Sequence, residues 1–346
     1  GQLAAGLMAA RRTLGDDDDN STANGARRAG EWWVAQAVTQ AGPTQGIVRS
    51  VDSREGGHGC ITDACGPTED LTDISDGSRG MFLLTNLTGD DVFADVATRS
   101  AYWQLKNMFV SGLDGMYYNV VNMTTGRHVT TPTMTMTARQ SSSSSSTGSI
   151  DLIARSNIEG SLFLDACRHH GDQAMCDAFL SQADMTVARQ DLHGLWMQWV
   201  PNDQTNDRFH PRFNTWYALS LLDAAEWLND NKSDAKTKTP MYENAAIATA
   251  RTMAQAQQIS GTIYYWNVIV NGTSVPVPEK NAPCGSAVAV ALQLWLRLYR
   301  RGHAEFVENI VRSVRWLLAN QFSSSHPDTN LAGSYFELGF RKLAKW

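Results

Sequence analysis

The feature that most constrains the fold is a motif that recurs along the chain, a glycine followed closely by aromatic residues. It begins at Gly115 (GMYYNV), Gly194 (GLWMQW), Gly261 (GTIYYWNV) and, more faintly, Gly333 (GSYFE). The four glycines lie 79, 67 and 72 residues apart, which is the length that a helical hairpin and its loops occupy. Glycine permits the left-handed conformation in which a chain leaves a helix. The motif therefore predicts repeated helical hairpins, each followed by a short extended piece that carries aromatic side chains.

Helical periodicity dominates the sequence between these motifs. Asp90 and Asp91 precede an apolar run, and Pro283 stands where the first turn of a helix tolerates proline. The segment 284–301 is apolar on more than one face, so we expect it to lie wedged between neighbouring helices. We predict helices over 2–13, 25–41, 68–86, 90–111, 150–169, 172–188, 212–229, 240–258, 284–301, 303–321 and 333–345.

Composition favours one large repetitive domain over residues 1–346. Hydrophobic residues make up 42% of the chain and charged residues only 18%, and the apolar positions are spread evenly. Two long loops interrupt the helices: a Gly-rich segment over 42–67, and a Thr-rich segment with six consecutive serines over 128–149. The second has no means of burying a core, so we expect a flexible loop or lid within the domain.

Charge and hydropathy exclude two classes of partner. The net charge of -6 and the scattered arginines argue against nucleic acid, because phosphate binding needs concentrated basic residues. The sequence has no uninterrupted apolar run of about 18 residues, so we expect no membrane span. The oligomeric state stays open at this stage.

The five cysteines indicate an oxidising compartment. Cys60 and Cys65, and likewise Cys167 and Cys176, have spacings that suit local disulfides. Neither pair has the C-x-x-C spacing of a zinc site, so we expect neither a metal nor a cofactor. For Cys284 we favour a small buried residue over a reactive thiol. A secreted or extracytoplasmic location is the expectation, and it fits the Asn-x-Ser/Thr sequons at Asn20, Asn86, Asn122, Asn231 and Asn271.

A polar and aromatic cluster opens the apolar helix pattern at 219–228. It contains His210, Arg212, Asn214, Trp216 and Tyr217. A sugar or uronate site needs this mixture, because forked donors grip hydroxyl and carboxylate groups while aromatic faces cover C–H groups. Histidine can also take a proton near neutral pH. The alternative is that the aromatic residues belong to the core and that Asn214 caps the helix.

A second polar group, Asp151, Arg155, Asn157 and Glu159, follows the serine run. Arg155 and Glu159 are four residues apart, which also suits a simple surface ion pair. Asn157 lies next to the apolar Ile158 inside the predicted helix 150–169, where an inward-facing amide needs a partner. The aromatic residues of the repeated motif form a third group, with one ring of each pair expected in the core and the other exposed: Tyr117, Tyr118, Trp196, Trp199, Tyr264, Tyr265 and Trp266.

Repeated hairpins with aromatic turns resemble the α/α toroid enzymes, which include glycoside hydrolases, polysaccharide lyases, uronyl hydrolases and terpene cyclases. The resemblance covers most of the chain and rests on architecture rather than on a family motif. It implies an all-α toroid, complete or incomplete, built from helical hairpins with short β-hairpin and long loop insertions. It also implies that inner helices and their loops converge on a saccharide-binding cleft.

The resemblance implies a carbohydrate-active enzyme whose partner is an acidic polysaccharide or oligosaccharide. Toroid lyases typically use Asn, His, Tyr and Arg at a uronate, and those types gather around 210–217. We therefore predict His210, Tyr217, Asn157 and Tyr264 as catalytic residues. The predicted substrate-binding residues are Arg212, Asn214, Trp216, Arg155, Trp196, Trp199, Tyr117 and Tyr265.

Several alternatives stay open beside the lyase. A glycoside hydrolase would use two carboxylates, and the candidates are Asp114, Asp151, Glu159, Asp191 and Glu337, without an evident pair. A uronate epimerase would share the abstraction of the C5 proton. A non-catalytic glycan-binding or extracellular assembly protein would keep the aromatic residues alone. A terpene cyclase is disfavoured, because the acidic run 16–19 lies in a turn-like segment.

Overall fold

The computed structural model describes residues 21–36, 39, 41–47, 58–59, 71–73, 79–128, 154–199, 201–231, 235–277, 282–322, 325 and 327. The chain divides into two compact units, Gly1–Thr186 and Val187–Trp346, and each is described by itself. The single domain over 1–346 stays a prediction.

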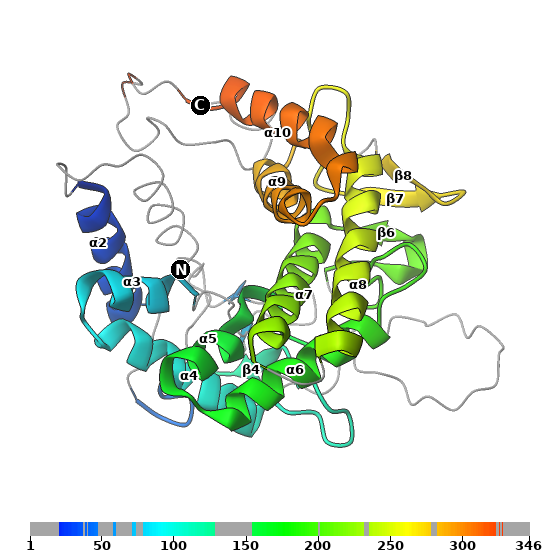
Figure 1. Ribbon diagram of the computed structural model, residues 1–346. Helices are drawn as coiled ribbons and strands as arrows, with labels where there is room; N and C mark the ends of the chain where they lie inside the picture. Colours follow the sequence, from blue (N-terminus) through cyan, green and yellow to red (C-terminus); the bar gives the residue numbers. More distant parts are fainter. Residues whose placement is uncertain are drawn as a thin grey trace. The chain divides into compact units, whose positions relative to one another are not determined.

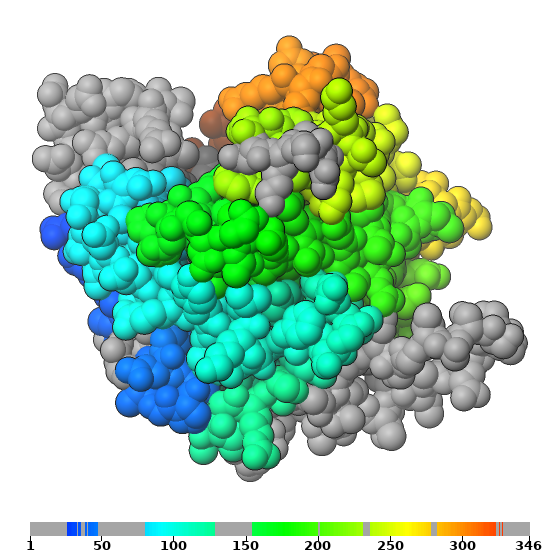
Figure 2. All heavy atoms as spheres, turned by 60° about the horizontal axis from the view of Figure 1, so that its bottom comes forward, coloured from blue at the N-terminus to red at the C-terminus, as the bar shows by residue number. Residues whose placement is uncertain are grey.

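The first unit is built from antiparallel helices with small sheets. Helices α3 and α4 form a hairpin, and both contact α5. In the space-filling view, the side chains of α3 and α4 (cyan) and of α5 and α6 (green) form one continuous surface (Figure 2). The helices are α2 (Ser21–Gln36), α3 (Arg79–Thr88), α4 (Val92–Asn107), α5 (Leu162–His170) and α6 (Gln173–Ala188).

The second unit contains two helical hairpins, with α7 lying beside α8 (Figure 1) and α9 packed against α10. Helix α9 also contacts α7 and α8, which confirms that the apolar segment 284–301 is wedged between neighbours. Trp295 of α9 is fully buried, and its indole Nε1 donates a 3.1 Å hydrogen bond to the Ala250 carbonyl of α8. The helices are α7 (Pro211–Asn231), α8 (Ala235–Ala256), α9 (Gly285–Arg300) and α10 (Val307–Ala319).

Ion pairs join three of these helices at their polar faces. Arg297 of α9 lies 2.9 Å from Asp223 and 3.0 Å from Glu226 of α7. Arg301, just after α9, pairs with Glu226 and lies 3.2 Å from Glu243 of α8. Because Asp223 is buried, the guanidinium of Arg297 offsets the desolvation of its carboxylate.

In the described part of the chain, three small sheets accompany the helices, which confirms the predicted short β insertions. One sheet has the order β1-β2-β4, a second pairs β3 with β5, and a third has the order β6-β7-β8. Asn271 and Gly272 close the β7–β8 hairpin with φ of 50° and 76°, as a tight two-residue turn requires. The strands are β1 (His58–Gly59), β2 (Leu71–Asp73), β3 (Tyr117–Tyr118), β4 (Val120–Asn122), β5 (Ala154–Arg155), β6 (Arg208–Phe209), β7 (Asn267–Val270) and β8 (Thr273–Pro276).

Two predicted helices begin too early in the sequence. The segment 68–86 is interrupted because residues 71–73 pair with β4, and α3 begins only at Arg79. The segment 150–169 is interrupted because Asn157, Gly160 and Ser161 have positive φ, which a right-handed helix excludes. The predicted helices 2–13 and 333–345, the fourth glycine motif, and most of the loops 42–67 and 128–149 lie outside the described residues.

At three of the recurring glycines, the backbone of a loop lies directly against the backbone of a helix. A Cβ on Gly115 would stand 2.0 Å from the Ser181 carbonyl oxygen in α6, and one on Gly194 would stand 2.5 Å from the Ala248 carbonyl carbon in α8. A Cβ on Gly261 would meet the Arg312 carbonyl oxygen in α10 at 2.2 Å. All three have φ between 74° and 91°. Each glycine follows one long helix and contacts the second helix of the next hairpin, so the repeat seen in the sequence is a repeat in packing.

Hydrogen bonds reinforce two of these contacts in the same way. Gln190 stands four residues before Gly194, and its Nε2 donates to Thr249 Oγ1 of α8 at 3.0 Å. Gln257 stands four residues before Gly261, and its Nε2 donates to Ser313 Oγ of α10 at 2.8 Å. The matching positions and partners show that the second unit contains the same loop–helix contact twice. We call this packing of a loop glycine on the backbone of a helix a glycine joint.

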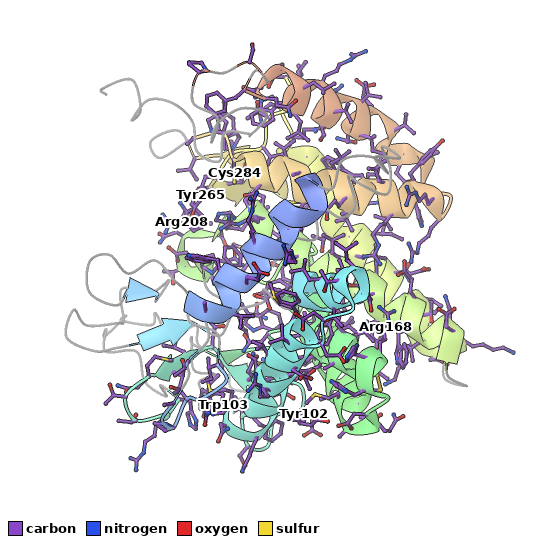
Figure 3. All side chains as sticks on the ribbon, turned by 90° about the vertical axis from the view of Figure 1, so that its left-hand side faces the viewer. Tyr102, Trp103, Arg168, Arg208, Tyr265 and Cys284 are labelled. Atoms are coloured by element: carbon purple, nitrogen blue, oxygen red, sulfur yellow. A yellow bond between two sulfur atoms is a disulfide. The ribbon has the colours of Figure 1, made fainter. Side chains whose placement is uncertain are left out.

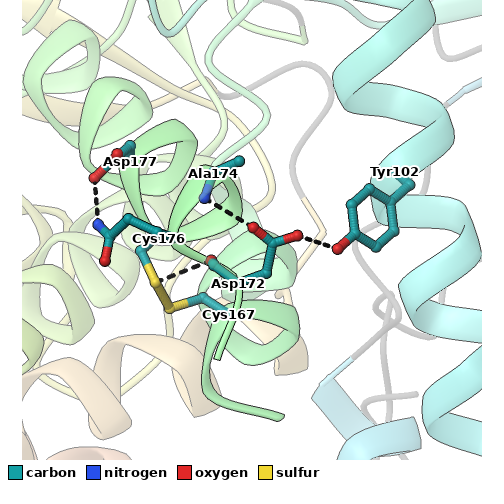
Figure 4. Close-up of a disulfide and its surroundings, with 7 residues drawn as sticks. Tyr102, Cys167, Asp172, Ala174, Cys176 and Asp177 are labelled. Carbon is teal, nitrogen blue, oxygen red and sulfur yellow. Dashed lines mark hydrogen bonds between the residues drawn. A yellow bond between two sulfur atoms is a disulfide. The ribbon is translucent and has the colours of Figure 1, made fainter. Parts of the chain in front are cut away.

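A disulfide between Cys167 and Cys176 clips α5 to α6 (Figure 4). Asp172 lies inside the closed loop and accepts a 2.8 Å hydrogen bond from the Ala174 amide, which caps α6. Its other carboxylate oxygen accepts a hydrogen bond from the Tyr102 hydroxyl of α4. The prediction of at least one disulfide is confirmed, whereas Cys60 and Cys65 lie outside the described residues.

Among the described residues, no helix combines the length and the apolar character needed to cross a membrane.

The glycine joint predicts a large cost for Gly194→Ala. The new methyl group would clash with the α8 backbone and would also occupy a left-handed conformation, so we expect a loss of about 3 kcal/mol in unfolding free energy. Gly272→Ala is the matched control, because Gly272 also has positive φ but nothing lies within 4 Å of its Cβ position. We expect about 1 kcal/mol for the control. Urea unfolding of both variants measures the difference, and equal losses would contradict the packing role.

Removing the disulfide should destabilise the α5–α6 hairpin. For a closed loop of this length the loss of unfolding free energy is about 2–3 kcal/mol. Denaturant titration of the C167S/C176S double variant measures it. Adding reductant should shift the wild-type midpoint by more than that of the variant, because a Cys60–Cys65 disulfide, if formed, is present in both proteins. An equal response of the two proteins to reductant would argue against this assignment.

Candidate functional site

The junction between β6 and α7 gathers charged and aromatic side chains in the second unit. The Arg208 guanidinium carbon lies 4.6 Å from the centre of the Trp266 ring. The Arg212 guanidinium carbon lies 5.2 Å from the centre of the Phe213 ring and 5.1 Å from that of Trp216. Figure 3 shows Arg208, Tyr265 and Cys284 in the same part of the unit. We call Arg208, His210, Arg212, Phe213, Trp216, Tyr265 and Trp266 the α7 cluster.

His210 occupies the centre of the α7 cluster and is fully buried. Its ring centre lies 4.2 Å from that of Tyr265, 5.2 Å from that of Phe213 and 5.3 Å from that of Trp266. Burial, and secondarily the charge of Arg212, lowers the pKa of His210 to about 3. The imidazole is therefore neutral at physiological pH. Burial among aromatic rings, which replace the water that an imidazolium needs, disfavours proton uptake by this histidine near neutral pH, and its catalytic role stays a prediction.

The hydrogen bonds of His210 fix its tautomer. Its Nδ1 accepts a 3.2 Å hydrogen bond from the Arg212 backbone amide, so the ring itself caps α7. A neutral imidazole that accepts at Nδ1 carries its proton on Nε2. Among the described residues, nothing accepts a hydrogen bond from this buried Nε2.

Other buried polar atoms near His210 also have no hydrogen-bond partner among the described residues. These atoms are Arg208 Nε, on the strand that precedes His210, and Asn267 Oδ1, on the paired strand β7. Because buried polar atoms are almost always hydrogen-bonded, these atoms can take up a water molecule or a polar ligand. The α7 cluster supplies the Nε2–H of His210 and the two guanidinium groups of Arg208 and Arg212, and Asn267 beside it supplies an acceptor.

Arg212 extends the α7 cluster to the start of α9. Its Nη1 donates a 3.2 Å hydrogen bond to Ser286 Oγ, which lies 3.4 Å from Cys284 Sγ. Cys284 is fully buried, as the sequence predicted. The first turn of α9 therefore positions the guanidinium of Arg212.

The Asn214 side chain is buried and makes its hydrogen bonds inside the protein. Its Oδ1 accepts a 2.9 Å hydrogen bond from the Trp196 amide, and its Nδ2 donates to Asn202 Oδ1 at 3.1 Å and to the His210 carbonyl at 3.0 Å. Asn202 Oδ1 in turn accepts from the His210 amide at 2.8 Å. These contacts leave Asn214 inside the fold and give it the task of holding His210 in place.

Three further predicted site residues form a buried aromatic group. Tyr217 lies edge-on to Trp196 at 5.1 Å and to Trp199 at 5.0 Å, and none of the three is more than 1% exposed. The expectation that one ring of the 196/199 pair faces outward was wrong, because the segment forms turns rather than a strand. Their burial favours a role in the core.

The first unit holds a separate polar group around Arg155. Its Nε donates to Asn119 Oδ1 and to Asn157 Oδ1, each at 3.0 Å, and its Nη1 lies 3.1 Å from Glu159 Oε1. Arg155 and Glu159 are both buried, so they are not a surface pair. Asn157 stands in a left-handed turn rather than in a helix, and its Nδ2 donates to the Tyr118 carbonyl at 3.2 Å.

Tyr117 belongs to the core of the first unit. It is 3% exposed and lies 5.4 Å edge-on from Phe163. Burial, with the charge of Asp114, raises the pKa of its hydroxyl far above the ordinary value. Its predicted contact with substrate is not favoured by this burial.

The remaining predicted residues are partly exposed. Trp216 and Tyr265 belong to the α7 cluster, whereas Tyr264 forms an isolated bridge with Pro283. Of the twelve predicted site residues, the structure brings together His210, Arg212, Trp216 and Tyr265. The roles of all twelve in binding and catalysis stay predictions.

Two of the carboxylates that a glycoside hydrolase could use are engaged in hydrogen bonds or ion pairs. Asp191 Oδ1 accepts hydrogen bonds from the amides of His193 and Leu195, each at 2.9 Å, which fixes the turn before Gly194. Glu159 is paired with Arg155, and Asp114 lies exposed in a turn. Asp151 and Glu337 lie outside the described residues. Within the described part of the chain, no group of three or more His, Cys, Asp or Glu side chains is arranged to hold a metal ion.

Sequence reasoning missed Arg208, Trp266 and Asn267. Trp266 was assigned only to the repeated aromatic motif, and the other two stand in short strands without a local signal. The signal is the pairing of β6 with β7, which sets Phe209 opposite Asn267. The sequence near position 208 contains no pattern that predicts pairing with β7, which lies about 60 residues further along the chain.

Comparisons with known proteins identify the fold. No family model matches the sequence, and no curated protein sequence matches it. Cellobiose 2-epimerase from Bacillus thermoamylovorans has a similar structure, with a TM-score of 0.65 and 12% identity over 97% of this chain and 78% of that one. A polysaccharide lyase gives 0.56 and 11% over 98% and 82%, and a glycosyl hydrolase of family 88 from Bacteroides vulgatus gives 0.55 and 12% over 98% and 83%. These neighbours are α/α toroid carbohydrate-active enzymes, and this chain has the α/α toroid fold.

The buried neutral state of His210 predicts an acid-sensitive fold. In the unfolded chain the imidazole takes a proton below about pH 6.5, whereas in the folded chain its pKa is about 3. Stability therefore falls as pH drops from 6.5 toward 3, by about 1.4 kcal/mol per unit from this residue. Urea unfolding at pH 7 and pH 5 should show wild type losing about 2 kcal/mol more than His210→Gln. Equal losses would show that His210 titrates normally.

Proposed function

We propose that this protein is an enzyme that binds an acidic saccharide at the α7 cluster and cleaves it by β-elimination at a uronate. The observation that carries the proposal is the set of buried donors around His210 beside two arginines that lie on aromatic rings. Arginine suits a planar carboxylate, and aromatic faces suit the C–H side of a sugar ring. The disulfide supports an extracytoplasmic location.

The α7 cluster contains no carboxylate of its own, which favours elimination over hydrolysis. Glycoside hydrolysis normally needs two carboxyl groups on either side of the scissile bond. In the described part of the second unit, Asp191 is engaged by backbone amides and Asp203 lies 3.4 Å from Arg208. Elimination at a uronate instead needs groups that neutralise the substrate carboxylate and one base, and the α7 cluster contains residues of both kinds.

Tyr265 is the base in this proposal, because its ring lies 4.2 Å from that of His210. Its phenolate takes the proton from C5 of the uronate, whose carboxylate lies between Arg208 and Arg212. The C4–O bond then breaks, a C4–C5 double bond forms, and the leaving oxygen takes the proton back from Tyr265. Tyr264, the other predicted tyrosine, is the alternative base.

Epimerisation is the second candidate. It starts with the same kind of step, removal of a proton from a carbon beside a carbonyl group, and differs in returning a proton to the opposite face. The likeness to a cellobiose 2-epimerase, at a TM-score of 0.65, supports keeping it. The products separate the two reactions.

The test is incubation with a panel of polyuronates, followed by the ultraviolet absorbance of unsaturated uronate. Elimination should produce this absorbance together with new reducing ends. Reducing ends without the absorbance would support a hydrolase, and an epimerised product without cleavage would support an epimerase. Binding without turnover would support a glycan-binding protein, and no response to any glycan would contradict the whole proposal.

Arg212→Lys should reduce kcat/KM by about 10- to 100-fold, because lysine replaces the planar fork with a point charge. This range corresponds to the roughly 1.5–3 kcal/mol that a hydrogen bond to a charged group contributes. Arg251→Lys is the matched control, since Arg251 is an exposed residue of α8 paired with Glu305. The control should keep full activity. If Arg212→Lys also kept it, the site would lie elsewhere.

A further inference from the structure

The tip of the β7–β8 hairpin carries a sequence motif that the proposed function does not use. Asn271, Gly272 and Thr273 form one of the Asn-x-Ser/Thr sequons, and all three residues are exposed. Asn271 and Gly272 are the turn residues, and nothing lies within 4 Å of the Cβ position of Gly272. Figure 1 shows the tip pointing away from α8. The sequon is therefore accessible in the folded protein.

The described part of the chain allows a comparison with two other sequons, at Asn86 and Asn122. Asn122 Oδ1 accepts a 3.1 Å hydrogen bond from the Thr124 amide, so this side chain closes a turn. Asn86 lies in α3, where the Thr88 hydroxyl donates a 2.8 Å hydrogen bond to the helix backbone. Residues two apart on a helix do not face each other, so this hydroxyl points away from the Asn86 amide. Of these three sequons, the folded chain presents Asn271 most openly.

The same hairpin exposes an apolar face. Val270 is 48% exposed and Val275 is 39% exposed. Residues directly opposite each other on paired strands share a face of the sheet, and the opposite pairs are Val268 with Val275 and Val270 with Thr273. Three valines therefore lie on the face that carries Thr273, and we call them the valine face.

Strand β8 is also the outer strand of its sheet. The order β6-β7-β8 leaves β8 paired with β7 alone among the described strands. Proteins commonly protect such an edge with charged side chains, but the sequence from 267 to 276 contains no charged residue. An exposed apolar edge without charge promotes association between chains, so the hairpin needs another form of protection.

We propose that Asn271 carries an N-linked glycan, and that this glycan covers the valine face and the free edge of β8. A glycan is bulky and solubilising, and this one is attached next to Val270 at the end of both strands. The inference is independent of the reaction proposed above. It shares with that proposal the extracytoplasmic location that the disulfide supports.

The donor of the glycan is a lipid-linked oligosaccharide. Nδ2 of Asn271 attacks the anomeric carbon of the first sugar, so that an N–C bond forms and the C–O bond to the lipid diphosphate breaks. The amide loses one proton, and the lipid diphosphate leaves with the electron pair of the broken bond. Because the new bond lies at the end of the side chain, the turn keeps its backbone conformation.

Mass spectrometry of intact glycopeptides tests the site on protein secreted from a eukaryotic host cell. Thr273→Ser and Thr273→Ala form a matched pair, because both lose the threonine methyl group and only the serine keeps the sequon. We expect a glycan on Asn271 in wild type and in Thr273→Ser, and none in Thr273→Ala. An unmodified Asn271 in wild type would overturn the proposal, whatever the state of the other sequons.

Light scattering against protein concentration tests the cover. We expect Thr273→Ala to associate at lower concentration than Thr273→Ser, and wild type treated with a glycosidase to behave like Thr273→Ala. Adding Val270→Thr and Val275→Thr to Thr273→Ala should shift the onset of association back to higher concentration. Equal onsets with and without the glycan, or a shift that the two valine substitutions do not relieve, would overturn the shielding role.

Discussion

The fold depends on the close approach of loop backbone to helix backbone at three glycines. At Gly115, Gly194 and Gly261 the missing Cβ is what lets a loop touch the second helix of the next hairpin. Any side chain there would push the hairpins apart by more than a well-packed interior can absorb. Each of these contacts lies within one unit and joins a loop to a helix that follows it in the chain, so the packing repeats through neighbouring contacts, as in other helical repeat proteins.

The glycine joints can be recognised in the sequence alone, and this is why the fold class was predictable. Glycine with a required left-handed φ and a run of aromatic residues are local signals, and the hairpin length between them is another. Helix starts were less predictable. Asn157 and Ser161 adopt positive φ, and the Asn157 side chain is hydrogen-bonded to Arg155 and to the Tyr118 carbonyl, whereas β2 replaces a helical start by pairing with β4, which is far away in sequence.

The candidate site was predictable in its location but not in its chemistry. His210 and Arg212 stand in a conspicuous cluster, yet the protonation of His210 depends on Tyr265 and Trp266, which come from the next loop. Sequence proximity also grouped residues with different tasks: Asn214 and Tyr217 share a helix with Arg212 but turn inward and build the core. Burial, which no local pattern reveals, separates these roles.

The turn at Asn271 and Gly272 sets the register of the β7–β8 hairpin. It thereby decides that Asn267 of β7 lies opposite Pro276 of β8 at the end of the hairpin away from the turn. Side chains alternate between the two faces of a strand, so a change of one residue in register reverses them all. Asn267 lies opposite Phe209, immediately before His210 in the chain. One residue more in this turn would shift β8 against β7 and reverse the faces of the β8 side chains, while Asn267 would stay opposite Phe209 in the β6–β7 ladder. The hairpin can therefore change its outer strand without disturbing the strand pair that leads into α7.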